Sequence, residues 1–190
     1  MIPNRLGHLI VVVGAMGSGK TEYLLDRVAA VEWNERLPRL WVPARDTRSR
    51  VGGQPCLYSR TGRYRHAVTW DLKQPSASEC HHIFDEIHLF PPSVVKWIAN
   101  ARQQQMTSVV VAGLERSSEG KPFPTTMALL EVADQVVRMA SRCRCGGLTS
   151  ETLCKVPKTS QILIGGDDLY EPVCRKCWLD ANHLRETKRQ

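Results

Sequence analysis

The sequence predicts an α/β fold in which helices flank a parallel sheet and a small cysteine-rich subdomain follows. Three observations lead to this prediction. Short apolar runs alternate with segments of helical periodicity, which is typical of a parallel sheet. A glycine-rich loop at residues 14–21 separates the first apolar run from the first helix. Five of the seven cysteines lie between Cys143 and Cys177, where the alternation stops.

The length and composition are those of one domain with a small appendage. The chain has 190 residues, and we expect a nucleotide-binding domain over 1–140, a cysteine-rich subdomain over 141–178 and a charged tail over 179–190. Its formal net charge of +7 permits an anionic ligand. No apolar run is long enough to span a bilayer, and the N-terminal run leads into glycines rather than a cleavage site. We therefore expect a cytoplasmic protein without a membrane segment.

The first half of the chain contains two predicted strands and one helix. Residues 8–13 form a β-branched run typical of a buried parallel strand. Apolar residues then recur at helical spacing over 21–32. Residues 40–42 form a short strand that ends at Pro43. The following stretch, 46–64, is rich in Arg, Gly and Ser, and we expect a long functional loop there.

The second half continues the alternation. We expect strands at 82–84, 108–112 and 135–139, and helices at about 93–102 and 125–133. The prolines before Ser93 fit the first turn of a helix, where a missing N–H costs nothing. The tail after Trp178 is charged and could be helical or frayed.

The glycine-rich loop reads Gly-Ala-Met-Gly-Ser-Gly-Lys-Thr and matches the phosphate-binding pattern G-x-x-x-x-G-K-[ST]. It follows a predicted strand and opens a predicted helix, which is the context that this motif requires. Its backbone N–H groups would surround phosphate oxygens, Lys20 would reach the β- and γ-phosphates, and Thr21 would bind Mg²⁺. The candidate nucleotide-binding residues here are Gly14, Ala15, Met16, Gly17, Ser18, Gly19, Lys20 and Thr21.

A second acidic site follows the strand at 82–84. Asp85 stands where P-loop proteins usually hold Mg²⁺, directly or through water. The adjacent Glu86 would point to the other side of an extended chain. It could activate a water molecule, as in an ATPase, or take a proton from an organic hydroxyl, as in a kinase.

The cysteines predict a structural zinc site. Cys174 and Cys177 form a C-x-x-C pair, and Cys143 and Cys145 form a C-x-C pair upstream. Four thiolates complete a closed tetrahedral Zn²⁺ site with no position for a substrate. Because C-x-C is the less common spacing, Cys154 could replace one member of the first pair.

In this order the motifs resemble those of type II thymidine kinases, which are P-loop deoxynucleoside kinases with a zinc-held loop called the lasso. The resemblance covers about residues 8–178. This chain keeps the family's Met in the phosphate loop, and it keeps Asp46 and Arg48 from a Lys-Pro-x-x-Asp-x-Arg segment while losing the lysine. The family's Asp-Glu-x-Gln-Phe-Phe appears as residues 85–90, and the end of the lasso matches over 164–177.

The resemblance implies a transfer of the γ-phosphate of ATP to the 5′-hydroxyl of a pyrimidine deoxynucleoside. Glu86 would then be the general base, and Lys20 and Arg48 would offset the developing charge. Asp46 and Asp85 would help to hold Mg²⁺, which makes ATP, Mg²⁺ and structural Zn²⁺ the expected cofactors. The implied nucleoside-binding residues are Met16, Leu89, Leu114, Ser118, Phe123, Thr152, Leu163 and Tyr170.

Several positions depart from the family pattern. Ser118 and Leu89 stand where the family has aromatic residues, and His88 replaces a Gln. An aromatic stack contributes about 1 kcal/mol, so this pocket could bind thymidine weakly or prefer another pyrimidine. Two other hypotheses remain: a P-loop ATPase with a zinc knuckle acting on nucleic acid, and a nucleotide sensor without turnover. The scattered basic residues make nucleic acid the weaker candidate partner. Family members are usually tetramers or dimers, so we expect a homo-oligomer.

Overall fold

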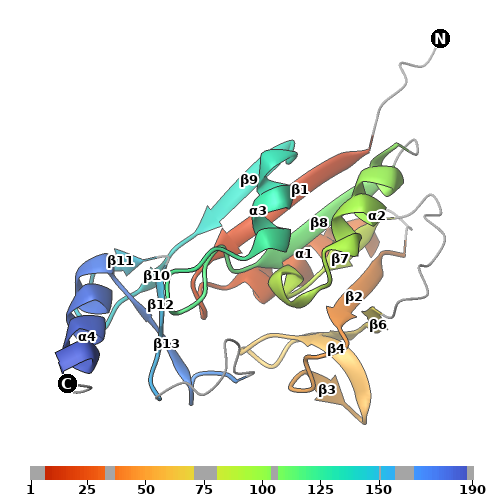
Figure 1. Cartoon of the computed structure of the whole chain (residues 1–190). Helices are drawn as coiled ribbons and strands as arrows, with labels where there is room; N and C mark the ends of the chain where they lie inside the picture. The colour runs from red at the N-terminus through yellow and green to blue at the C-terminus, as the bar shows by residue number, and fades with distance from the viewer. Residues whose placement is uncertain are drawn as a thin grey trace.

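The computed structural model describes residues 7–32, 37–70, 81–103, 107–149, 151–156 and 165–187. Its centre is a six-stranded parallel sheet in the order β6-β2-β7-β8-β1-β9 (Figure 1). The strands, in sheet order, are Val68–Trp70, Arg39–Pro43, His82–Phe84, Ser108–Gly113, His8–Gly14 and Gln135–Met139. The predicted α/β fold with a central parallel sheet is confirmed.

Alternate residues of each strand point to opposite faces of the sheet. Helices cover both faces. Leu9, Val11 and Val13 of β1 face a core formed with helices α2 (Ser93–Arg102) and α3 (Pro124–Glu131). Their neighbours face a second core formed with helix α1 (Lys20–Glu32). Figure 1 shows α1 on one side of the sheet and α2 and α3 on the other. The buried apolar runs of the sequence are therefore strands covered on both faces.

The expected long loop at 46–64 is only partly correct, because this stretch also contains strands. It forms a small antiparallel sheet of β3 (Arg50–Val51), β4 (Gln54–Tyr58) and β5 (Tyr64–His66). Leu57 is fully buried in the core under α1, which ties β4 to the main sheet. Gly52, Gly53 and Gly62 have positive φ and allow the two tight turns.

Three further boundaries differ from the expectation. The edge strand β6 has three residues, too short to show a period of two in the sequence. The third helix ends at Glu131 rather than 133. The charged tail belongs to helix α4 (Arg175–Thr187), which begins inside the second cysteine pair, so its described part is helical.

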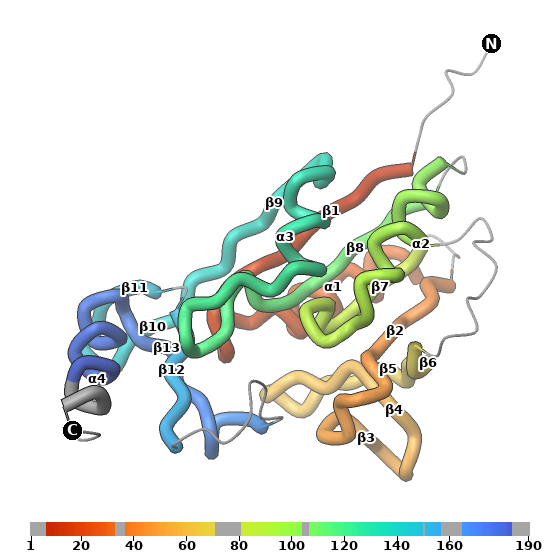
Figure 2. Tube along the Cα trace, viewed as in Figure 1, coloured from red at the N-terminus to blue at the C-terminus, as the bar shows by residue number. Residues whose placement is uncertain are grey.

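The cysteine-rich part contains two small hairpins and α4. Strand β10 (Ser141–Arg142) pairs with β11 (Leu148–Thr149), and β12 (Glu151–Cys154) pairs with β13 (Tyr170–Val173). The β12–β13 hairpin reaches toward β4 and β5 below the main sheet (Figure 2). Among the described residues, no helix combines the length and the apolar character needed to cross a bilayer.

We expect Phe84→Ala to lower the free energy of unfolding by about 3–5 kcal/mol, because it opens a cavity in the main core. Phe84 is fully buried and contacts Trp41, Trp70 and Trp97 at ring centroid distances of 6.1, 5.7 and 5.9 Å. Denaturant titration followed by tryptophan fluorescence measures the change. Val68→Ala in the exposed part of β6 is the control, with an expected change within about 0.5 kcal/mol. Equal losses in the two variants would contradict this account of the core.

Candidate nucleotide and metal sites

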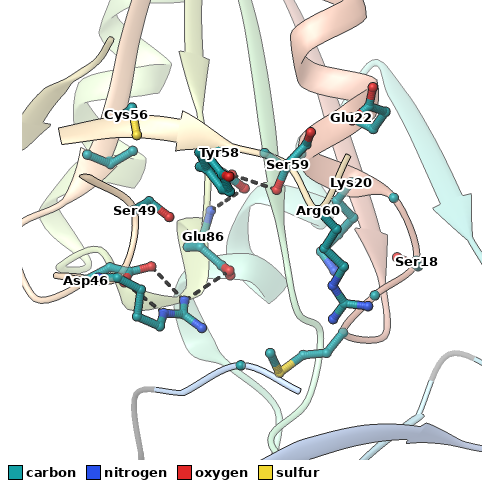
Figure 3. Close-up of a pocket in the computed structure, with 18 of the residues that line it drawn as sticks. Ser18, Lys20, Glu22, Asp46, Ser49, Cys56, Tyr58, Ser59, Arg60 and Glu86 are labelled. Atoms are coloured by element: carbon teal, nitrogen blue, oxygen red, sulfur yellow. Dashed lines mark hydrogen bonds and ion pairs between the residues drawn. The ribbon is translucent and has the colours of Figure 1, made fainter. Parts of the chain in front are cut away.

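A cavity of about 530 Å³ lies between the phosphate loop, the β4–β5 hairpin and the acidic residues after β7 (Figure 3). Gly17 and Gly19 of the loop have φ values of 74° and 86°, which a side chain would disfavour. Of the sequence-predicted residues, the cavity is lined by Met16, Gly17, Ser18, Gly19, Lys20, Thr21, Asp46, Arg48, Asp85 and Glu86. The first strand, the second strand and the seventh strand thus deliver these groups to one edge of the sheet.

Lys20 is held inside the loop that precedes it. Its side chain is buried, and Nζ donates to the carbonyl oxygens of Gly14 at 3.0 Å and Ala15 at 2.8 Å. Burial lowers the pKa of Lys20, while the charges of Glu86 and Asp85 raise it. A phosphate at this loop would offer the ammonium group a stronger, charged acceptor than these carbonyls.

Thr21 connects the phosphate loop to the second acidic site. Its hydroxyl donates to Asp85 Oδ2 at 2.9 Å. Burial, and then the neighbouring charge of Glu86, raise the pKa of Asp85 to about 7. A divalent cation bound there would favour the ionised carboxylate. Thr21 and Asp85 therefore form a hydroxyl–carboxylate pair suited to a hard cation.

Glu86 has the one positive φ value, 53°, among the described residues other than glycine. Its backbone N–H donates to Asp85 Oδ1 at 2.9 Å, which fits this turn. The side chain is 25% exposed, accepts from Arg48 Nη2 at 3.3 Å and lies 3.5 Å from His88 Nδ1. The turn thus directs the Asp85 carboxylate to Thr21 and leaves the Glu86 carboxylate accessible from the cavity.

Arg48 is fixed beside Glu86 by Asp46. Its Nε and Nη2 donate to the two carboxylate oxygens of Asp46 at 2.8 and 2.6 Å, and Nη1 donates to the carbonyl of Gly165. Burial would raise the pKa of Asp46, but the hydrogen bonds from Arg48 outweigh it and the pKa is lowered. Asp46 is therefore ionised, and its charge is partly balanced by Arg48.

The predicted nucleoside-binding residues lie in two groups. Leu114 N–H donates to His88 Nδ1 at 3.3 Å, and the His88 ring lies 4.7 Å from that of Phe123. On the other side, Met16 N–H donates to Thr152 Oγ1 at 3.1 Å. Burial lowers the pKa of His88 to about 4, so the imidazole is neutral at physiological pH. Both groups border the Glu86 and Met16 ends of the cavity.

The remaining substrate predictions have different surroundings. Leu89 is buried in the short 3-10 helix Ile87–Leu89, and Tyr170 pairs with Cys154 across β12 and β13. Ser118 is buried, and its carbonyl accepts from Trp178 Nε1 at 3.0 Å. Of the described members of the predicted nucleoside-binding set, Met16 alone lines the cavity. Leu163 lies outside the described residues, and the substrate roles of the set stay predictions.

Several residues that line the cavity were not among the predicted site residues. They include Glu22, Tyr58, Ser59, Arg60, Thr61 and Asp167, of which 59–61 belong to a stretch that resembles a Ser-Arg-x-Gly segment of the family. The arginine-rich composition of 46–64 pointed to this stretch. Because the stretch was expected to be a loop, it gave no strand register from which to predict that Arg60 faces the cavity. Asp167 had no signal of its own, because its position depends on a contact across more than one hundred residues with Arg60.

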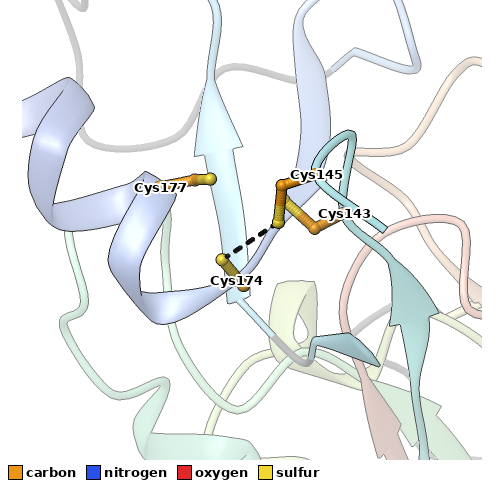
Figure 4. Close-up of side chains that lie close together, drawn as sticks. All are labelled: Cys143, Cys145, Cys174 and Cys177. Carbon is orange, nitrogen blue, oxygen red and sulfur yellow. Dashed lines mark hydrogen bonds between the residues drawn. The ribbon is translucent and has the colours of Figure 1, made fainter. Parts of the chain in front are cut away.

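Four thiols gather at the start of α4 and at the turn after β10 (Figure 4). The Sγ atoms of Cys143, Cys145, Cys174 and Cys177 all lie within 4.8 Å of one another. Backbone hydrogen bonds, first from Cys145, lower the pKa of Cys143 to about 6 and favour a thiolate. Cys154 is buried elsewhere and its Sγ is 3.3 Å from the Val156 carbonyl. The four thiols could hold Zn²⁺, and Cys143 rather than Cys154 completes the group.

The phosphate loop after β1 and the acidic pair after β7 define a P-loop nucleotide-binding protein. The chain belongs to the thymidine kinase family, whose model, described as Thymidine kinase, matches residues 7–178.

Curated proteins named Thymidine kinase support this assignment. One from Roseiflexus castenholzii is 31% identical, with 92% of this chain and 96% of the relative covered. One from Chloroflexus aurantiacus (strain ATCC 29366 / DSM 635 / J-10-fl) is 31% identical, covering 94% and 98%. One from Bacteroides fragilis (strain YCH46) is 29% identical, covering 93% and 89%. The family resemblance of the motifs is confirmed.

We expect purified wild-type protein to carry roughly one zinc per chain, because four thiolates satisfy one tetrahedral ion. Cys143→Ser removes a ligand and is expected to lose most of the metal. Cys154→Ser removes a buried thiol outside the group and is expected to keep it. Elemental analysis after gel filtration measures both. Equal zinc content in the two variants would show that Cys143 is not a ligand.

Proposed function

We propose that this chain is an ATP-dependent thymidine kinase, which transfers the γ-phosphoryl group of ATP to the 5′-hydroxyl of thymidine or a related pyrimidine deoxynucleoside. The observation that carries the proposal is the position of Glu86. It stands one residue beyond the Thr21–Asp85 pair, opens onto the P-loop cavity and is flanked by Arg48 and His88. Membership of the thymidine kinase family supports a base for a nucleoside hydroxyl there.

Glu86 accepts the proton of the 5′-hydroxyl as its oxygen bonds to the γ-phosphorus. The bond from that phosphorus to the β,γ-bridging oxygen breaks, and ADP leaves with the electron pair. Lys20 and Arg48 offset the negative charge on the transferring group. Most of the rate comes from positioning and electrostatics, since the protein forms no covalent bond.

Mg²⁺ fits the oxygen donors of Thr21 and Asp85, with Asp46 nearby on β2's carboxyl side. When bound, it neutralises charge on the phosphates and orients them. Thr21 and Asp85 would hold the ion, and the buried Asp85, with its raised pKa, would be ionised by its presence. Asp46 is already ionised beside Arg48 and contributes through that ion pair.

The nucleoside site is proposed to lie between the Leu114–His88–Phe123 group and the Met16–Thr152 contact. Leu89, Ser118, Leu163 and Tyr170 complete the proposed set. The His88 and Phe123 rings, which lie against each other at an interplanar angle of 52°, supply an aromatic surface near Glu86, although Ser118 and Leu89 replace aromatics of the family. This favours a pyrimidine ring and leaves room for a preference other than thymine.

Zinc at the four thiols is proposed to be structural, holding the lasso within a subdomain at 141–178 next to a kinase domain at 1–140. Four protein ligands leave no open position for catalysis. The described part of the 179–190 tail, up to Thr187, belongs to α4. We further propose a cytoplasmic homo-oligomer, a tetramer or dimer, as the working form of the enzyme.

We expect Glu86→Gln to lower thymidine phosphorylation by about 100-fold or more, because an amide cannot accept the proton. ATP binding should persist, since Lys20 and the phosphate loop are unchanged. Steady-state assays of thymidine-dependent ADP release measure the loss. Glu131→Gln, which neutralises an exposed carboxylate at the end of α3, is the control and should keep full activity. If Glu86→Gln retained most of its turnover, Glu86 would not be the base.

We expect phosphoryl transfer from Mg-ATP to thymidine or deoxyuridine to exceed transfer to deoxycytidine and deoxyguanosine. Chromatographic detection of the 5′-monophosphates measures each rate. A different pyrimidine ranking first would assign the substitutions at Ser118 and Leu89 to specificity. Turnover with no nucleoside, together with hydrolysis stimulated by DNA, would overturn the proposal in favour of a nucleic-acid-dependent ATPase; nucleotide binding without any turnover would indicate a sensor.

A further inference from the structure

An ion pair among the residues that line the cavity has no part in the mechanism above. Arg60, at the turn between β4 and β5, donates from Nη2 to a carboxylate oxygen of Asp167, which precedes β13. The two residues come from different parts of the chain, the β4–β5 hairpin and the end of the lasso. Both line the cavity that contains the phosphate loop.

The Arg60 guanidinium lies directly over the phosphate loop. It is so close to the Gly17 α-carbon that any Cβ there would clash with it. Figure 3 shows Arg60 beside Lys20, and the charge of Arg60 lowers the pKa of Lys20. Two cations therefore face a loop whose N–H groups bind anions. Such an arrangement is favourable when an anion lies between them.

The backbone that carries Arg60 is anchored, so its side chain can move alone. Thr61 Oγ1 donates to Glu22 Oε2 at 3.0 Å, and Arg63 pairs with Glu22 and with Asp26 of α1, the latter at 2.8 Å. The same contacts hold the hairpin tip against the helix that follows the phosphate loop. Arg60 thus stays within reach of the phosphates whichever anion it contacts.

Asp167 is the nearest anion when no nucleotide is bound, and it is placed by its own neighbours. Lys155 Nζ donates to the Asp167 carbonyl, and Gly166 N–H donates to Asp168 Oδ1 at 2.9 Å. Half or more of each partner's side chain is exposed, 54% for Arg60 and 63% for Asp167. Exposed pairs of this kind are weak because solvent screens them. A triphosphate offers more charge and several oxygens and can displace the carboxylate.

We propose that Arg60 is a second phosphate-binding cation and that Asp167 holds it in the nucleotide-free enzyme as a substitute for phosphate. The inference rests on the proposed function, because it assigns the phosphates of ATP to this cavity. ATP binding would exchange the Arg60–Asp167 contact for an Arg60–phosphate contact. The exchange releases Asp167, at the end of the lasso, from its contact with Arg60 beside the ATP site. It would therefore couple ATP binding to the nucleoside site that the lasso borders.

The test compares ATP affinity in Arg60→Gln, Asp167→Asn and the double variant. We expect Arg60→Gln to weaken binding about 10-fold or more, because a charge-assisted contact is lost. Asp167→Asn should tighten binding about threefold by removing the competitor, and should change it little in the Arg60→Gln background. Calorimetric titration of each full-length protein with Mg-ATP measures the dissociation constants. Arg65→Gln is the control, since Arg65 lies on the same hairpin, pairs with Glu32 and is absent from the cavity lining.

Three results would overturn the inference: unchanged ATP affinity in Arg60→Gln, weaker binding in Asp167→Asn, or an equal effect of Asp167→Asn in both backgrounds. The last result would mean that Asp167 repels phosphate directly. Because calorimetry needs no nucleoside, the inference is tested even if the wild type phosphorylates no deoxynucleoside. If the variants show the expected changes in ATP affinity but the wild type has no turnover, the proposed function alone would be refuted.

Discussion

The hydrogen bond from the Thr21 hydroxyl to Asp85 joins the first turn of α1, which follows β1, to the residue after β7, 64 residues further along the chain. It is possible because β1 and β7 run parallel on either side of β8, so their carboxyl ends open at the same edge. Apolar burial on both faces of the sheet sets the register that brings the two residues together. Loss of that register would separate the phosphate loop from Asp85. The direction of the Glu86 side chain depends on the turn after β7 that also positions Asp85.

Charge balance explains why the pKa values of the two aspartates near this edge shift in opposite directions. Asp46 accepts two hydrogen bonds from the Arg48 guanidinium and one from its backbone N–H, and it has a lowered pKa, whereas Asp85 is buried beside Glu86 and has a raised pKa. The site is therefore short of positive charge at Asp85 and already balanced at Asp46. A divalent cation at Asp85 would correct this shortage, which is a physical reason for the enzyme to bind its nucleotide together with a metal ion.

Local signals predicted the central sheet and the phosphate loop, since β-branched runs and the Gly-Lys-Thr pattern need no long-range information. The strand at 82–84 and the helix at 93–102 have the predicted bounds. The β4–β5 hairpin was missed because its arginines and glycines resemble a loop, while the burial of Leu57 depends on packing under α1. The geometry of the proposed nucleoside site was equally hidden: the contact of His88 with Phe123 joins residues from separate segments. The sequence could not decide that Cys143 rather than Cys154 groups with Cys174 and Cys177, because this depends on how the turns after β10 and before α4 fold.

The lasso side of the molecule has little core of its own. Cys143, Leu153 and Val173 are the buried members of its one small apolar cluster in the described part, and Cys174 and Cys177 pack against that cluster. At its other end it is held by polar contacts alone: Thr152 with Met16, Gly165 with Arg48 and Asp167 with Arg60. Each of these contacts reaches a residue that lines the nucleotide cavity. A metal at the thiols would fix one end of the lasso permanently, while the nucleotide would rearrange the contacts at the other. Zinc and phosphate would thus act on opposite ends of one loop, and this division would let a segment with little hydrophobic core respond to the donor nucleotide and still keep its place.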